Sequence, residues 1–529
     1  MGNGAARTWL SKLPLWAAVV AGAVLILGIA ALALFVLTQY VSVNQKQPSS
    51  FDLIRLALTV AAGFGGLVAL VVAYRRQRDL EDGRFIERFG AAAAQLGDTD
   101  VAVRIAGVYA MAGAADRTTD REQRQQCIDV LCGYLRLPHF PESANNHQTQ
   151  RVYRQRFGHD STGPEEETTF EYRQNDREVR QTIVRVITSH LQPEARSSWS
   201  SHEFDFSGAY LENAGFRRAI FNGETTSFKG TSFRGETTSF DKATFSGKNT
   251  LFTGATFSGE NTIFTGATFS SETTGFGRAT FSGETISFEK STFSGKNTIF
   301  TGATFSSETT SFTDATFSGK ITKFNNANFS SRDTRFSGVV FSGETTRFHT
   351  VTFSGESTHF RKATFLGEEA SFRGATFSGD TRFGGTIFSN ETTRFTDATF
   401  SGKNAYFTRA TFSSETTLFD KSTFSSIDTR FTTATFSGKN TIFTGATFSG
   451  QATSFKGATF SGETVLFKGA TFSSEITSFD WVKFGVGEIS FEAPSQWEPA
   501  PKFAWDKEGA TVTKPANVKP VAWPPVRGS

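Results

Sequence analysis

Phenylalanine recurs along this chain at alternating intervals of five and seven residues, and this period limits what the chain can fold into. Twenty-two such pairs lie between Phe228 and Phe484, and a single interval, from Phe377 to Phe383, is six residues long. A 12-residue unit cannot bury two aromatic rings by itself, but stacked units can align their rings in columns and pair their backbones. The period therefore predicts a solenoid whose core is a ladder of Phe rings.

Small residues accompany the rings at fixed positions. Ala mostly stands two residues before the second Phe of a unit, as at Ala255, and Thr mostly two before the first, as at Thr250. Because side chains two apart on a strand share a face, we expect these residues to point inward with the rings. The extra pair of the longer interval, as in Glu260-Asn261, is expected at an outward corner. Two geometries remain open: a four-sided coil of two units, or a coil of one unit with two rings inside.

Just before this array the chain reads Ala209-Tyr-Leu-Glu-Asn, Ala214-Gly-Phe-Arg-Arg and Ala219-Ile-Phe-Asn-Gly, three consecutive units of A-x-[L/F]-x-x. These units resemble the tandem motif of the pentapeptide-repeat protein family. The resemblance implies a mainly β chain, a right-handed parallel β-helix over residues 200–493, built here from 12-residue units.

The ends of a solenoid expose strand edges that need covers. The helix that precedes the array and the segment 199–206 are expected to cover its start. Residues 494–529 contain Pro and three Trp and are predicted to form a C-terminal cap, with partner binding by the tail as the alternative.

Residues 79–193 are predicted to form a small α-helical module. Apolar residues recur at helical spacing up to Leu96, from Val101 to Ala115, after a capping Asp120, and over 176–191. Residues 137–175 are predicted to be irregular. The passage from Glu87 to Arg136 also resembles a helical module found in bacterial, membrane-anchored pentapeptide-repeat proteins, and no activity comes with that resemblance.

No residue stands out as catalytic, cofactor-binding or metal-binding. Cys127 and Cys132 are expected to be small buried hydrophobic residues in a reducing compartment, and His139 lacks metal-ligand spacing. Catalysis needs unlike groups at one place, whereas the array repeats the same Ser, Thr, Lys and Glu, and His349 and His359 should simply point outward. The prediction is therefore a chain that is no enzyme and has no cofactor or metal.

Two apolar stretches, residues 15–37 and 56–74, lie within the N-terminal segment 1–78. Each is long enough to cross the hydrocarbon layer of a bilayer, so they are predicted to form a two-helix transmembrane anchor with the bilayer as a partner. Lys and Arg precede the first stretch and follow the second. The positive-inside rule then predicts a multi-pass protein of the inner or plasma membrane with cytoplasmic N- and C-termini.

The charge balance bears on nucleic acids as partners. Some pentapeptide-repeat relatives imitate DNA with a strongly acidic rod and inhibit topoisomerases. This chain departs from that pattern, because residues 224–484 contain 23 Asp and Glu against 25 Lys and Arg. A DNA mimic that binds topoisomerases is therefore a disfavoured alternative, and a nucleic-acid partner is not expected.

The main prediction is a non-enzymatic, membrane-tethered β-solenoid that acts as a scaffold for unidentified protein partners at the cytoplasmic face, with its oligomeric state open. Rows of outward Thr and Ser leave ice binding, or a structural role of the surface, as a further alternative. Nine basic residues could form a stripe for an acidic partner or lipid headgroups, although neutralisation by acids such as Glu344, Glu356 and Glu368 is the favoured interpretation. The nine are Lys323, Arg332, Arg335, Arg347, Arg361, Lys362, Arg373, Arg382 and Arg394.

Overall fold

The structure is a computed structural model that describes residues 24, 28, 31–32, 35, 50–139, 150–156, 165–171, 176–508 and 510–526. The chain divides into two compact units, Met1–Gly90 and Ala91–Ser529.

The apolar stretch 56–74 does not form a helix of its own. It lies inside α3 (Ser50–Leu96), which continues without a break through Arg75, Arg76 and Arg78. No helix in the described part of the chain is both long and apolar enough to cross a bilayer. The transmembrane hairpin is therefore unsupported, and the prediction of a multi-pass membrane protein is wrong. The other predicted span, 15–37, lies outside the described residues except for scattered positions.

The helices of the second unit follow the sequence closely. They are α4 (Val101–Arg117), α5 (Arg121–Arg136) and α6 (Asp176–His190). The Asp120 carboxylate caps α5 by accepting hydrogen bonds from the Glu122 and Gln123 N–H groups, as predicted.

Both cysteines are buried in α5 and form no disulfide. Burial raises the pKa of the Cys127 thiol to about 12, so this thiol stays protonated and unreactive. The interpretation of Cys127 and Cys132 as small buried hydrophobic residues is confirmed.

The segment predicted to be irregular contains a β-hairpin. Strands β1 (Gln150–Arg156) and β2 (Glu165–Glu171) pair antiparallel. Neither strand shows the alternation of apolar and polar residues that predicts a half-buried strand. An ion pair joins the two strands instead, with Arg154 Nε 2.9 Å from Glu167 Oε2.

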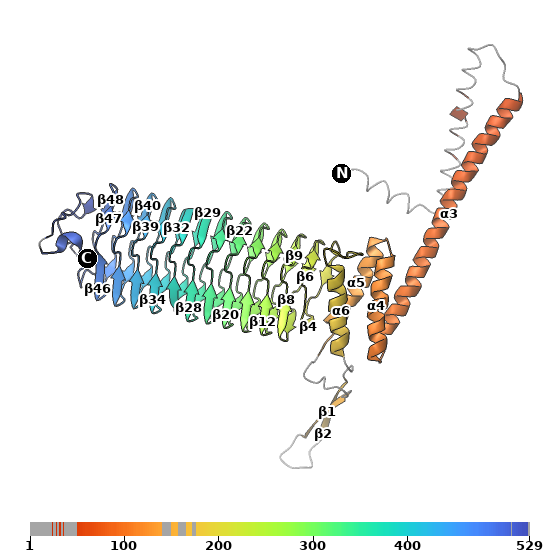
Figure 1. Cartoon of the computed structure of the whole chain (residues 1–529), viewed down its shortest axis with the longest axis horizontal. Coiled ribbons are helices and arrows are strands. Elements are labelled where there is room, and N and C mark those ends of the chain that lie inside the picture. The colour runs from red at the N-terminus through yellow and green to blue at the C-terminus, as the bar shows by residue number, and fades with distance from the viewer. Residues whose placement is uncertain are drawn as a thin grey trace, which may run out of the picture. The chain divides into compact units, whose positions relative to one another are not determined.

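The repeat region is a parallel β-solenoid with four-sided coils (Figure 1). One coil consists of β10 (Asn249–Leu251), β11 (Thr256–Phe257), β12 (Asn261–Ile263) and β13 (Thr268–Phe269), and the next begins with β14 (Thr273–Gly275). Asn249 pairs in parallel with Thr273, so one coil runs from Asn249 up to the residue before Thr273. This settles the geometry that the sequence left open, because each coil contains two of the repeated units.

We number the four faces by this coil. Face 1 contains β10 and the strands stacked on it, face 2 those of β11, face 3 those of β12 and face 4 those of β13. Faces 2 and 3 are 12-stranded sheets, so the solenoid has about twelve coils. Faces 1 and 4 form one continuous sheet, because β29 (Thr364–Ser371) and β32 (Ile387–Arg394) run through the corner between them.

The core consists of four columns of Phe rings. Phe252 stacks on Phe276 with ring centroids 4.7 Å apart and planes 1° apart, and Phe264 stacks on Phe288 in the same way at 4.7 Å and 1°. These rings are fully buried, and so are Ala255 and Thr262 beside them. The predicted inward positions are confirmed. The nearly parallel ring planes also show that successive coils are related almost by a pure translation, with very little twist.

The six-residue interval between Phe377 and Phe383 shortens one corner. Thr352 pairs with Thr376, a full coil further on, whereas Ser357 pairs with Asp380, one residue short of a full coil. The missing residue comes from the corner alone, so Phe383 still stacks at 4.7 Å on the ring one coil below.

Gly at a corner lets coils approach closely. A Cβ on Gly295 would lie 1.7 Å from the Ser271 carbonyl oxygen of the coil below, so no side chain fits there without a backbone shift. Some coils carry Ser at this corner instead, and the Ser271 hydroxyl is then buried at 2.7 Å from the Thr250 hydroxyl.

Other parts of the chain pack against both ends of the solenoid. At the start, Trp199 is fully buried and the Ile220 N–H donates to the Leu191 carbonyl at 2.8 Å. At the other end, β49 (Lys502–Phe503) and β50 (Val518–Lys519) extend the sheets of the last coils. The aromatic rings of the tail pack over the last coil: Trp497, Trp505 and Trp523 lie 4.6–6.4 Å from Phe503.

Candidate functional site

The outward side chains of the solenoid fall into a constant set and a variable set. Face 2 is constant: its strands carry Thr before the buried Phe and Ser after it, with one Asn, in ten successive coils. The outward residues of face 2 are Thr256, Thr280, Thr304, Asn328, Thr352, Thr376, Thr399, Thr423, Thr447 and Thr471, with Ser258, Ser282, Ser306, Ser330, Ser354, Ser378, Ser401, Ser425, Ser449 and Ser473.

Face 3 varies, and the charged residues of its strands from β8 (Thr237–Ser239) to β46 (Ile476–Phe479) are confined to five neighbouring coils. The strands are β24 (Asp333–Arg335), β28 (Ser357–His359), β31 (Asp380–Arg382), β34 (Asn404–Tyr406) and β38 (Asp428–Arg430). Their first residues form an acidic column and their third residues a basic column, because the strands pair in register. We call these two columns together the face 3 ladder. The acidic column is Asp333, Ser357, Asp380, Asn404 and Asp428, and the basic column is Arg335, His359, Arg382, Tyr406 and Arg430.

Ion pairs join the two columns within single strands. Each of the three arginines contacts the aspartate two residues before it. The nitrogen to oxygen distances are 2.6 Å for Arg335 and Asp333, 3.2 Å for Arg382 and Asp380, and 2.5 Å for Arg430 and Asp428.

Further contacts join one coil to the next. The Asn404 amide donates to Asp380 at 2.6 Å, and the Tyr406 hydroxyl donates to Asp428 at 3.1 Å. The Arg430 guanidinium lies 4.9 Å above the Tyr406 ring, within the range of a cation–π contact.

Charged and uncharged residues alternate along both columns. Ser357 and Asn404 separate the three aspartates, and His359 and Tyr406 separate the three arginines. Burial lowers the pKa of His359 although Asp333 acts in the opposite direction, so this ring is neutral at pH 7. No two like charges are therefore direct neighbours, an arrangement that avoids repulsion across about 4.8 Å.

Face 1, on the opposite side of the coil, carries a cluster with an excess of positive charge. Its members are Lys323 on β22 (Ile321–Lys323), Arg347 on β26 (Thr345–Arg347), Glu369 on β29 and Arg394 on β32. Both guanidinium groups reach the one carboxylate, at 3.1 Å for Arg347 and 3.6 Å for Arg394. We call these four residues the face 1 cluster.

The nine basic residues from Lys323 to Arg394 do not form a single stripe. Lys323, Arg347 and Arg394 lie on face 1, whereas Arg335 and Arg382 lie on the opposite face 3. The other four lie at turns and corners between strands.

Acidic residues neutralise some of these nine basic residues. Arg332 lies between Glu308 and Glu356, at 3.6 Å and 3.0 Å. Glu344 instead pairs with Lys320, which is outside the series, at 3.0 Å.

The helical module contains a buried ionic network. Arg104 of α4 is fully buried and donates to Asp176 at 3.0 Å, as an acid-paired arginine would. The same carboxylate accepts from the Tyr134 hydroxyl at 2.5 Å and from Arg180 at 2.6 Å. Burial alone would raise the pKa of Asp176, but hydrogen bonds from His139, Tyr134 and Arg180 outweigh it and hold the pKa well below its ordinary value. The network ties α4, α5 and α6 together.

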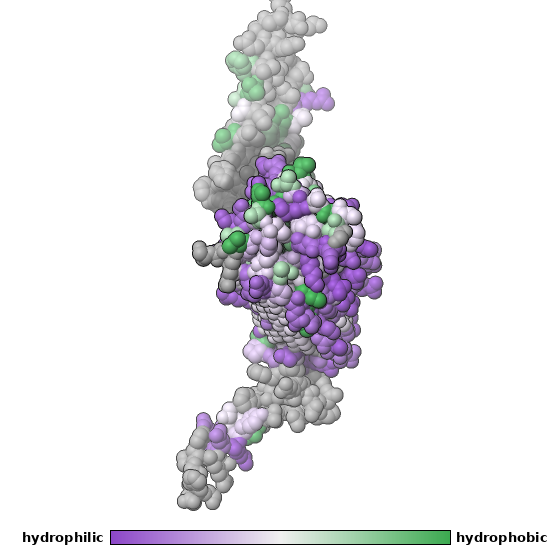
Figure 2. All heavy atoms as spheres, turned by 90° about the vertical axis from the view of Figure 1, so that its left-hand side faces the viewer, coloured by the Kyte–Doolittle hydropathy of each residue, from purple (hydrophilic) through white to green (hydrophobic). Residues whose placement is uncertain are grey.

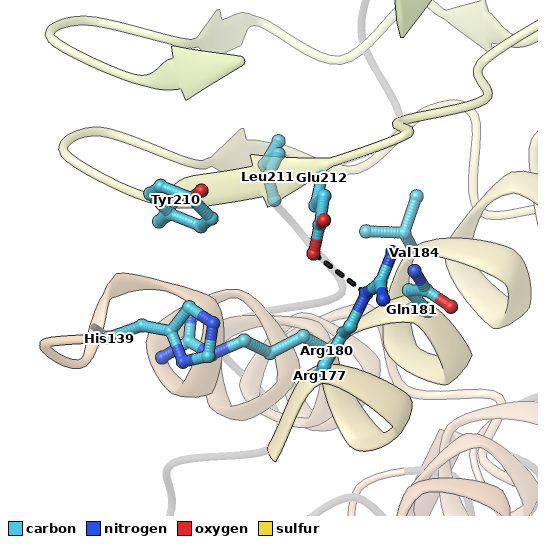
Figure 3. A pocket seen from close by; sticks show the side chains of 8 residues that line it. All are labelled: His139, Arg177, Arg180, Gln181, Val184, Tyr210, Leu211 and Glu212. Carbon is cyan, nitrogen blue, oxygen red and sulfur yellow. Dashed lines mark ion pairs between the residues drawn. The ribbon is translucent and has the colours of Figure 1, made fainter. Parts of the chain in front are cut away.

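A small hollow lies where α6 meets the first coil (Figure 3). The Arg177 guanidinium crosses it to Glu212 at 2.8 Å, and the His139 ring lies 5.3 Å from the Tyr210 ring. The remaining space is about that of one water molecule. This hollow is a joint between the helices and the solenoid and does not have room for a ligand.

The described ranges hold no group of three or more His, Cys, Asp or Glu residues placed to bind a metal. Figure 2, which views the solenoid from its C-terminal end, shows a mostly hydrophilic surface with scattered hydrophobic residues. The features of this surface that stand out are therefore the face 3 ladder, the face 1 cluster and the constant rows of face 2.

Stacked four-sided coils with Phe columns inside define a parallel β-solenoid as the class of this protein. A family model described as pentapeptide repeats, with nine copies, matches residues 343–387 and 360–403 and supports the pentapeptide-repeat family for this chain. The match is not informative about a bacterial source or a membrane anchor. Neither the curated proteins nor the solved structures gave a match.

Proposed function

We propose that this chain is a non-enzymatic scaffold that binds proteins through the outward residues of the coils between β22 and β38. The helical module at 79–193, the solenoid at 200–493 and the cap at 494–529 serve as its three parts. The observation that carries the proposal is that outward residues change in these coils while the inward Phe rings do not.

The packing of the Phe rings does not explain why the outward residues change. Phe324, Phe336, Phe348 and Phe360 are all fully buried in these coils, like the rings elsewhere in the solenoid. Face 2 also keeps its Thr and Ser in the same coils apart from Asn328, so the variation is not spread evenly over the surface. Face 4 also changes in these coils, at Val340, Leu366 and Ile387, but only the strands of faces 1 and 3 gain charged residues there. The residues that vary on these two faces and serve no packing role are free to provide recognition.

The residue types on these faces also fit a protein partner. Arg and Tyr are enriched in protein interfaces, whereas Lys, Glu, Asp and Ser are depleted. The three Asp of the ladder are each paired with an Arg, and the enriched types Arg and Tyr make up four of its ten residues. The ladder contains no Lys and no Glu, and the side chains of Arg335, Arg382 and Arg430 are 47%, 38% and 50% exposed. Equal numbers of Arg and Asp in the ladder do not favour DNA mimicry.

The test is cross-linking of the full chain in its source cells, followed by mass spectrometry. The test variant replaces Lys323, Arg347 and Arg394 by Ser, the residue at Ser371 in the same column. The control variant replaces Thr352 and Thr376 of face 2 by Ser. A partner enriched with the wild type, lost with the test variant and kept with the control supports the proposal. If no protein is enriched over a control without the solenoid, the scaffold function fails.

The constant rows of face 2 favour one second candidate, a surface that orders water or binds ice. Thr and Ser repeat there at the coil spacing of about 4.8 Å on a face with almost no twist. Thermal hysteresis measured for the wild type and for Thr376→Lys tests this candidate. Equal freezing behaviour of both proteins would remove it.

A further inference from the structure

We propose that face 3 pairs with face 3 of a second copy of this chain, so that two solenoids lie side by side with their axes parallel. The inference rests on the proposed function, because it assigns a partner to one of the two variable faces.

The face 3 ladder has the geometry that such a pair needs. Its two columns run along the solenoid axis, since Arg335 pairs with His359 and Tyr406 with Arg430 in register. The columns are also nearly straight, because the buried rings behind them, from Phe336 to Phe431, stack with planes only 1–7° apart. Two straight columns can stay in contact over several coils.

Symmetry then decides which arrangement the charges allow. A two-fold axis parallel to the solenoid axis places the basic column of one copy against the acidic column of the other, coil for coil. A two-fold axis across the solenoid places basic against basic and acidic against acidic. Opposite charges attract and like charges repel, so only the parallel arrangement is complementary.

Each strand of the ladder then meets its equivalent in a favourable way. The pair of Arg335 and Asp333 meets the same pair of the second copy as a square of four alternating charges. The same holds for the other two Arg–Asp pairs. Tyr406 comes opposite the second copy's amide at position 404, which can accept or donate a hydrogen bond.

The expected dimer is weak and sensitive to salt. Five coils span roughly 24 Å and the face is one strand wide, which is less than the standard interface of about 800 Å² per partner. Half-exposed charges are also screened at high ionic strength. The dimer should therefore form reversibly at low salt and dissociate at high salt.

Sedimentation velocity of the full chain over a range of concentrations tests the pairing by charge exchange. The acidic variant carries Arg335→Asp, Arg382→Asp and Arg430→Asp, and the basic variant carries Asp333→Arg, Asp380→Arg and Asp428→Arg. We expect each variant alone to be monomeric, their mixture to form a heterodimer, and the chain with all six changes to dimerise again. If dimerisation returns in the mixture and in the six-residue variant, the monomeric variants are folded and have lost only the interface.

The control adds three charges to face 4 through Ser318→Asp, Ser342→Asp and Ser437→Asp, and it should dimerise like the wild type. A wild type that stays monomeric at low salt, or an acidic variant that still dimerises alone, would overturn the pairing. If the ladder variants instead lose a different protein in the cross-linking experiment, the ladder belongs to that protein and the pairing is also overturned. A monomeric wild type leaves the scaffold function standing, since that function is tested separately through the face 1 cluster.

Discussion

Replacing Phe324 by alanine, in the middle of the ring ladder, should destabilise the solenoid strongly and divide its unfolding into two steps. The Phe324 ring is fully buried. It stacks on Phe300 at 4.8 Å and on Phe348 at 4.7 Å, and it meets Phe312 and Phe336 edge to face at 5.9 Å and 5.8 Å.

The magnitude follows from these contacts. Removing a buried Phe side chain costs about 3–5 kcal/mol, because apolar burial is lost and a cavity remains. The stacked and edge-to-face partners each contribute about 0.5–1.5 kcal/mol beyond burial, so the upper part of that range is expected. Coils of a solenoid interact only with their neighbours, so the weakened coil should uncouple the parts on either side of it.

Urea unfolding of the full chain measures both effects. Circular dichroism reports all strands, and tryptophan fluorescence is weighted toward the C-terminal end of the solenoid and its cap, which hold Trp481, Trp497, Trp505 and Trp523. The matched control is Phe484→Ala, at a half-buried ring that stacks at 6.1 Å on its neighbour below. We expect separate transitions for the two signals in the Phe324 variant and a smaller shift without separation in the control. Equal midpoints for the two variants, with coincident signals, would refute the reasoning.

Three further perturbations test other parts of the fold. Gly295→Ala should lower the free energy of unfolding by about 3 kcal/mol or more, because its Cβ would meet a carbonyl oxygen at 1.7 Å. Ser271→Ala at the equivalent corner position should lower it by only about 1 kcal/mol, for one lost hydrogen bond, and calorimetry of the two variants compares these effects. Asp176→Asn should lower the melting temperature, since it leaves buried Arg104 uncompensated at a cost of about 3–5 kcal/mol. Because the folded pKa of Asp176 is depressed, its contribution is present above the unfolded carboxyl pKa of about 3.9 and lost as pH falls below it, so the variant should show a flatter acid dependence of stability. Trp523→Ala removes the indole N–H that donates to Asp506 at 3.1 Å, and hydrogen exchange should rise in the last coil without a change at the first.

The Phe period predicted the core because burial depends on which residues point inward, and that is a local property of each repeated unit. The surface depends on the number of units per coil, which the period does not contain. Arg335 and Arg347 are one unit apart and lie on opposite faces, whereas Arg335 and His359 are two units apart and lie in one column. The signal that would reveal the ladder is the residue just before the first Phe of every second unit, and it becomes readable only when the coil length is known.

The remaining differences arise from interactions between distant residues. In the sequence Asp176 is an acid at the start of a helix, yet one of its partners, Arg104, is 72 residues away. The hairpin of β1 and β2 has no apolar alternation, and an ion pair between Arg154 and Glu167 joins its strands. The stretch 56–74 shows an apolar composition, but composition does not reveal that the helix continues through a run of arginines.

Deleting one repeated unit separates the period of the core from the period of the surface. Removal of residues 361–372 joins Phe360 to Arg373 and keeps the five-residue interval to Phe377, so the Phe columns remain continuous. Every later coil is then turned by half a coil, which moves the upper rows of the face 3 ladder to the opposite face.

The matched control deletes residues 265–276, which lie before the ladder, and turns the whole ladder as one block. Both deletions remove a single unit of the array and should melt at similar temperatures, because each solenoid keeps the same kinds of ring contacts. Only the deletion of 361–372 should abolish the salt-sensitive dimer, as measured by sedimentation velocity. If the two deletions dimerise equally, a continuous ladder on one face is not what pairs the solenoids; if the deletion inside the ladder unfolds while the control does not, the core depends on more than the positions of its rings.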